Sequence, residues 1–86
     1  MIEARAVMLT KEQIRMARAA LGWGVRELAQ SAGVSANTVS RFENGLGVQV
    51  ETLRRLESAL EKAGIIFVPE DENFGPGVRL KTPPKY

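Results

Sequence analysis

The apolar spacing of residues 11–21 is that of an amphipathic helix. Its apolar residues recur three and four positions apart, which places them on one face: Ile14, Ala17 and Leu21. The start of the helix is also indicated. Thr10 and Gln13 have the spacing of a capping box, and Leu9 and Ile14 have the spacing of a hydrophobic staple. Gly22 ends the pattern, and we interpret Trp23 as a packing residue. A first helix is therefore predicted over residues 11–21.

Residues 25–45 predict two short helices joined by a tight turn. Gly33 ends the first helix at residue 32, because glycine adopts a left-handed conformation at little cost, and Ser35 caps the second. The inward-facing residues are Leu28 and Ala29 in the first helix and Val39 and Phe42 in the second. The second helix ends at residues 44–45. Its remaining residues point elsewhere, and most are short and polar: Ala36, Asn37, Thr38, Ser40, Arg41 and Asn44.

The rest of the chain changes from a helical to a strand-like period. Residues 50–63 predict a helix with the apolar stripe Leu53, Leu56 and Leu60. Residues 65–68 are β-branched or aromatic and residues 78–81 alternate apolar and charged, so 65–81 predicts a β-hairpin. We interpret the acidic run at 70–72 as a solvated loop.

The pattern divides the chain into three parts. Residues 1–8 lack periodicity and are interpreted as an arm, residues 9–64 as a helical domain, and residues 65–86 as a hairpin tail. The predicted fold class is mainly α, with four to five helices and a C-terminal β-hairpin.

The composition is that of one folded domain, and it excludes several kinds of chemistry. Of the 86 residues, 44% are hydrophobic and 26% charged, which argues against disorder. The chain has no Cys and no His, so disulfides, the usual zinc sites and histidine catalysis lack their residues. We expect no metal, no cofactor and no enzymatic activity. No apolar run has the length of a membrane span and no signal peptide precedes the domain, so we expect a cytoplasmic protein.

The positive charge lies in the first part of the chain. Residues 1–50 hold six Lys or Arg against four Asp or Glu, whereas residues 51–86 hold six of each, and the net charge is +2. This excess accompanies the two short helices, as nucleic-acid binding requires.

The sequence resembles the lambda-repressor/Cro-like (xenobiotic-response-element) helix-turn-helix regulators over about residues 9–63. The residues that carry the resemblance are Leu28-Ala29, Ala32-Gly33-Val34-Ser35, Thr38-Val39-Ser40 and Glu43-Asn44-Gly45. It implies a lambda-repressor-like domain, bound to duplex DNA as a dimer, with the helix after Ser35 in the major groove. We therefore expect a bacterial transcriptional regulator, associated with the nucleoid.

The resemblance also implies which residues contact DNA. Arg41 would contact guanine, Asn37 adenine and Ala36 a thymine methyl group. The expected phosphate contacts are Val25, Arg26, Ser35, Thr38, Ser40 and Asn44. The chain departs from the family at Gly24-Val25, where a Gln side chain often anchors the phosphate, so Arg26 is expected to replace it. Arg18 and Glu43 match a pair that meets in some relatives, and we interpret them as a structural ion pair.

The apolar tail leaves two interpretations. A lone two-stranded hairpin is marginally stable, so it either packs on the helices or pairs with a second subunit. We favour a dimer interface formed by Ile65, Ile66, Phe67, Val68, Val78 and Leu80. A two-fold dimer would place two recognition helices about 34 Å apart and predicts a palindromic operator.

Three functions compete. The first is a sequence-specific DNA-binding regulator. The second is the DNA-binding antitoxin of a toxin–antitoxin pair, whose tail would bind a protein partner. The third is a protein-interaction module that has lost DNA binding, which Gly24-Val25 and the small net charge favour.

Overall fold

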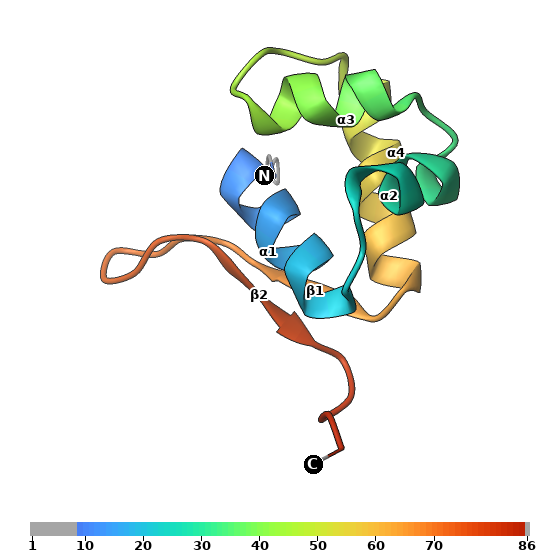
Figure 1. Ribbon diagram of the computed structural model, residues 1–86. Helices are drawn as coiled ribbons and strands as arrows, with labels where there is room; N and C mark the ends of the chain where they lie inside the picture. Colours follow the sequence, from blue (N-terminus) through green and yellow to red (C-terminus); the bar gives the residue numbers. More distant parts are fainter. Residues whose placement is uncertain (1–8, 86) are drawn as a thin grey trace.

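The computed structural model describes residues 9–85, and the predicted arm at 1–8 lies outside them. Four helices and one hairpin follow one another in this part of the chain (Figure 1): α1 Lys11–Leu21, α2 Val25–Ala32, α3 Ala36–Glu43, α4 Val50–Lys62, β1 Ile65–Val68 and β2 Gly77–Leu80. The predicted fold class, mainly α with a C-terminal hairpin, is confirmed. Over these residues, no helix is long and apolar enough to cross a membrane.

Local capping accounts for where the first three helices begin and end. The Thr10 hydroxyl accepts from the Gln13 N–H at 3.1 Å, while the Gln13 amide oxygen accepts from the Thr10 N–H at 3.0 Å. Gly33 ends α2 at φ 71°, a left-handed conformation that side chains with a Cβ rarely adopt. The Ser35 hydroxyl then accepts from the Thr38 N–H at 3.1 Å and starts α3.

Two predicted elements have boundaries that differ by one residue. Helix α4 ends at Lys62 rather than at Ala63, because Ala63 is its cap and Gly64 leaves the helical conformation at φ 107°. Strand β2 runs over Gly77–Leu80 rather than 78–81, because Gly77 pairs with Val68 across the hairpin.

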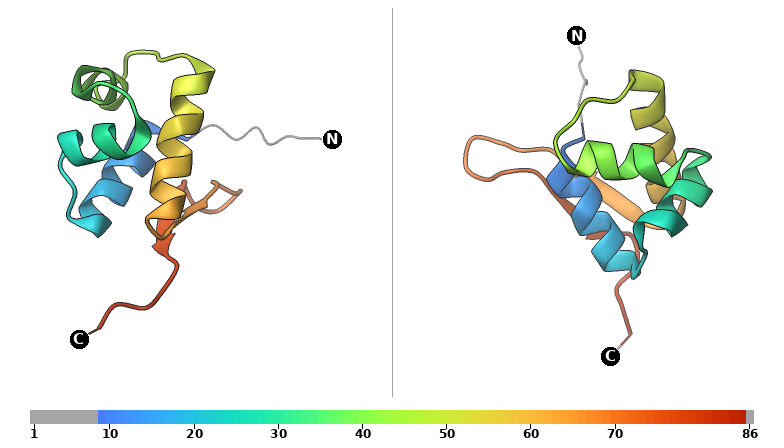
Figure 2. Two further views of the ribbon diagram at one scale, coloured as in Figure 1. Left: turned by 90° about the vertical axis from the view of Figure 1, so that its right-hand side faces the viewer. Right: turned by 45° about the horizontal axis from the view of Figure 1, so that its top comes forward.

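One apolar core joins all the helices to the hairpin. Its largest fully buried side chains come from each helix in turn: Ile14, Leu28, Val39, Leu56 and Leu60. Helix α3 packs on α1 and α2, and α4 packs on α2. The hairpin lies against the other side of the bundle, β1 on α4 and β2 on α1, and its loop extends away from the helices (Figure 2).

The hairpin is antiparallel, with Ile65 opposite Leu80 and Phe67 opposite Val78. Ile65 is only 2% exposed, and Phe67 and Val78 pack against the core from the same face of the hairpin. The hairpin therefore packs on the helices of its own chain, which is the first of the two interpretations of the tail.

Candidate nucleic-acid interface

Helix α3 presents a polar face to solvent. Asn37, Arg41 and Asn44 recur four and three residues apart and are all exposed, which places them in one row along the helix. Val39, on the opposite side, is fully buried. Among the described residues, the Arg41 side chain has no hydrogen bond or ion pair, so its five N–H donors are free to bind a ligand.

Shorter side chains flank this row. Ala36 and Ser40 are half-buried on one side of it, and Thr38 is half-buried on the other. The Ser35 and Thr38 hydroxyl oxygens lie 2.8 Å apart and share one hydrogen bond, so one hydroxyl hydrogen of the pair is still available to donate. The structure thus brings all the predicted base-contacting residues, and four of the predicted phosphate-contacting ones, onto α3 and its cap.

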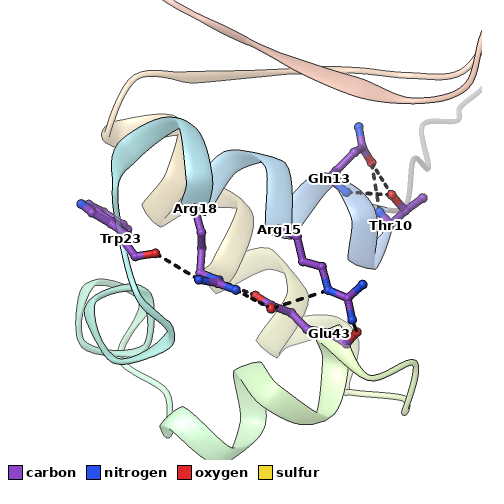
Figure 3. Close-up of polar contacts among 6 residues, drawn as sticks. All are labelled: Thr10, Gln13, Arg15, Arg18, Trp23 and Glu43. Carbon is purple, nitrogen blue, oxygen red and sulfur yellow. Dashed lines mark hydrogen bonds and ion pairs between the residues drawn. The ribbon is translucent and has the colours of Figure 1, made fainter.

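Arg18 and Glu43 meet between α1 and α3 in a bidentate pair (Figure 3). The Arg18 Nε and Nη2 atoms donate to the two Glu43 carboxylate oxygens at 2.6 and 2.7 Å. Arg18 Nη1 also donates to the Trp23 carbonyl at 3.0 Å, so a single guanidinium joins α1, α3 and the turn before α2. This hydrogen bonding to Glu43 raises the pKa of Arg18, against the opposing effect of burial. The pair joins two helices of the same chain, and the Glu43 side chain is only 8% exposed.

Arg15 is a second contact to Glu43 that the sequence analysis missed. Its Nε lies 3.9 Å from Glu43 Oε1, and its Nη2 donates to the Glu43 backbone carbonyl (Figure 3). It lies one turn of α1 before Arg18, and that i, i+3 spacing of two arginines was the signal available in the sequence. Two guanidinium groups therefore fix the C-terminal end of α3 to α1.

The start of α2 is less suited to an anion than the start of α3. The Glu27 carboxylate accepts from the Gly24 N–H at 2.8 Å and so occupies the N-terminal end of the helix. Val25 is half-buried against the core, while Arg26 is exposed. A phosphate at the predicted Val25 site would share this helix end with a carboxylate, and Arg26 is the cation nearest in sequence.

Two further cations lie beside the turns that bound α3. A Cβ atom placed on Gly45 would lie 3.4 Å from Lys11 Nζ, and one placed on Gly33 would lie 3.6 Å from Arg55 Nη1. Glu51 partly neutralises Arg55 at 3.6 Å, whereas Lys11 has no ion-pair partner among the described residues. No pattern along the sequence pointed to Lys11, because helix packing alone brings it to the end of α3.

The predicted dimer residues separate into three groups by burial. Ile65 belongs to the chain's own core, so its side chain has almost no surface to offer to another subunit. Phe67, Val68 and Val78 are half-buried. Ile66 and Leu80 are 46% and 40% exposed and retain the largest free apolar surface on the strands. The described residues contain no group of three or more acidic, Cys or His side chains that could hold a metal ion.

Comparison with known proteins points to the same unit. A family model described as helix-turn-helix matches residues 14–64, which is more than half of the chain. A protein of Archaeoglobus fulgidus, provisionally named an HTH-type transcriptional regulatory protein, is 37% identical over 54 residues. The match covers 63% of this chain but only 18% of that longer relative, which is archaeal.

Proposed function

The chain belongs to the lambda-repressor/Cro-like helix-turn-helix family, and from this we propose that it binds double-stranded DNA sequence-specifically and regulates transcription as a dimer on a palindromic operator. The observation that carries the proposal is the exposed row on α3, Asn37, Arg41 and Asn44, opposite the buried Val39. A helix of two turns that is buried on one side and polar on the other is suited to the major groove.

The residues of the row and its neighbour Ala36 have distinct roles in this proposal. Arg41 donates two hydrogen bonds to guanine O6 and N7, and Asn37 pairs with adenine N6 and N7. Ala36 contacts a thymine methyl group. The Arg15 and Arg18 contacts to Glu43 hold α3 at one angle, so these side chains enter the groove in a defined register.

Phosphate contacts would flank the base contacts. Ser35, Thr38, Ser40 and Asn44 offer hydroxyl or amide donors along α3, and Arg26 replaces the anchoring side chain that Val25 lacks. We add Lys11 to this set, because its ammonium group lies beside Gly45 at the end of α3 and has no described partner.

One observation favours the alternative that the domain binds protein rather than DNA. The Glu27 carboxylate at the start of α2 opposes a phosphate there and weakens one expected anchor. A salt titration separates the two functions. Binding to phosphates predicts that the logarithm of affinity falls by about 0.9 per contact for each unit rise in the logarithm of salt concentration. An affinity for selected DNA that is independent of salt would contradict the phosphate contacts, and no measurable affinity for any selected DNA would contradict DNA binding.

The decisive experiment compares three arginines on a site selected from random DNA. Arg41→Ala should weaken binding to that site by about 1–3 kcal/mol and relax one base position. Arg26→Ala should weaken binding equally on all sequences and reduce the salt slope by about 1. Arg54→Ala, an exposed arginine on α4, is the control and should change neither. Equal losses for Arg41→Ala on specific and random DNA would show that Arg41 meets only phosphate.

A further inference from the structure

The tip of the hairpin carries a largely exposed aromatic side chain. Phe74 is 76% exposed, the most of the exposed large hydrophobic side chains in residues 9–85, and it lies in the loop that extends away from the helices (Figure 2). The loop is nevertheless held in shape, because the Asp71 carboxylate accepts from the Asn73 and Phe74 N–H groups at 2.8 and 2.7 Å. The backbone that carries the exposed ring is therefore held by hydrogen bonds.

A second apolar surface lies at the other end of the hairpin, which we call the root. Ile66 pairs with Arg79 across the strands, so both side chains lie on the face turned away from the core, and Lys81 directly follows the end of β2. Ile66 is 46% exposed, whereas Leu80 pairs with Ile65 and so lies on the opposite face of the hairpin. The root thus combines apolar surface with two cations.

Tip and root carry opposite charges. The tip holds three carboxylates, Glu70, Asp71 and Glu72, and none of them or of the root cations makes an ion pair with a described residue. Extended chain rises about 3.3 Å per residue, so on the order of 15–20 Å separates the two ends, beyond the screening length of about 8 Å at physiological salt. The two ends cannot neutralise each other within one chain.

The geometry points to a second copy of this chain as the partner of this surface, docked antiparallel so that the tip of each hairpin lies on the root of the other. Phe74 of each copy then packs on Ile66 of the other, and each acidic tip meets Arg79 and Lys81. A two-fold axis generates both contacts from one complementary surface. A parallel arrangement would instead oppose like charges at the tips, which is unfavourable.

This inference rests on the proposed function, because it specifies how the dimer proposed on DNA is held together. It also replaces the predicted interface residue Ile65, which is buried in its own chain, by Phe74, which is not. The acidic loop, interpreted from the sequence as merely solvated, becomes one half of the contact.

The first test measures the dimer dissociation constant by sedimentation without DNA. Phe74→Ala should raise it by at least about tenfold, because the dimer then loses an aromatic anchor at each of its two contacts. Leu46→Ala removes a side chain that is 49% exposed on the loop after α3, and it should leave the dissociation constant unchanged. An unchanged dissociation constant for Phe74→Ala would overturn the inference.

The second test reverses charges at each end. One variant carries Glu70→Lys and Glu72→Lys at the tip, with Asp71 kept because its carboxylate holds the loop. The other carries Arg79→Glu and Lys81→Glu at the root. Each variant alone should sediment as a monomer, because like charges meet in both halves of the dimer, and an equimolar mixture should form a heterodimer. That recovery also shows that both variants are folded.

The outcomes separate this inference from the proposed function. Three results would each overturn the tip-to-root contact. The tip-reversed variant could dimerise like the unmodified chain, or the mixture of the two variants could stay monomeric. The unmodified chain could also be a monomer at concentrations at which it binds its selected DNA. Each of these leaves sequence-specific DNA binding intact. Absence of specific DNA binding in every variant overturns the proposed function, while the sedimentation results still decide the contact.

Discussion

Helix α3 and the hairpin are both fastened to α1, but by different chemistry. At α3, the Arg18 guanidinium binds the Glu43 carboxylate twice, at 2.6 and 2.7 Å, and Arg15 adds further contacts. At the hairpin, the Gln13 amide nitrogen donates to the carbonyls of Val68 and Gly77 at 3.1 and 3.0 Å. Bonds between charged groups are roughly twice as strong as neutral ones, so we expect α3 to be the more rigidly held of the two.

The difference matters because α1 connects the two regions. Gln13 and Arg18 lie five residues apart on the same helix, one fastening the proposed dimer element and the other the proposed recognition helix. In a dimer, the separation of the two recognition helices then depends on both attachments. The attachment at Gln13 is the weaker of the two. A change there should alter the preferred spacing between DNA half-sites while leaving the base contacts of α3 unchanged.

Leu56→Ala should have the largest effect, and it should weaken both regions together. Leu56 is fully buried on α4, which packs on α2 on one side and on β1 on the other. Removing its side chain should destabilise the fold by about 2–5 kcal/mol, measured by urea unfolding. Amide exchange should accelerate in α3 and in the hairpin alike. A nearly neutral substitution would contradict the position of α4 in the core.

Arg18→Met should weaken α3 and spare the hairpin. It leaves the buried Glu43 carboxylate without its bidentate partner, so the free energy of unfolding should fall by about 3 kcal/mol, the lower end for a broken buried pair because Arg15 remains nearby. Exchange should accelerate in α3 before it does in β1 and β2. Lys11→Met, a cation on the same helix without an ion-pair partner among the described residues, is the control for removal of a charge.

The pKa of Arg18 gives this prediction a pH dependence with a definite sign. A cation whose pKa is raised in the folded state contributes its full stabilisation at every pH below its ordinary pKa, and loses it only as the pH rises through the raised value. The Arg18 contribution should therefore be constant through the neutral range. The unmodified chain and Arg18→Met should therefore differ in free energy of unfolding by the same amount at neutral and at mildly alkaline pH. A smaller difference at mildly alkaline pH would contradict this prediction.

The sequence predicts what depends on neighbouring residues. Thr10, Gly33 and Ser35 mark helix ends because their caps act within three or four residues, and α1 and α2 have the predicted bounds. The strand boundary at Gly77 is harder to predict from the sequence, because it depends on the pairing of Gly77 with Val68, nine residues earlier.

Contacts between distant elements are where prediction from the sequence ends. Gln13 is recognisable as half of a capping box, but its amide nitrogen reaches carbonyls 55 and 64 residues further along the chain. The run 65–68 has no polar residue to mark an outer face, so the burial of Ile65 and the exposure of Ile66 could not be told apart. The pair of Arg18 and Glu43 was accessible only through the resemblance to a family.

Gln13→Glu should release the hairpin while keeping the start of α1. A glutamate still accepts from the Thr10 N–H, as the Gln13 oxygen does at 3.0 Å, but it has no amide hydrogens for Val68 and Gly77 and places a carboxylate against their carbonyls. The loss should be about 1–3 kcal/mol, with faster exchange in β1 and β2 and unchanged exchange in α3.

Thr10→Ala is the matched control, because it removes the other half of the capping box without touching the hairpin. It should cost about 1 kcal/mol and leave exchange in β1 and β2 unchanged. If the hairpin also joins two copies on DNA, Gln13→Glu should tolerate half-sites one base pair closer or further apart better than the unmodified chain does, whereas Thr10→Ala should not. Hairpin amides that stay protected in Gln13→Glu would show that apolar packing at Ile65 alone holds the hairpin, and that α1 does not set the spacing through this contact.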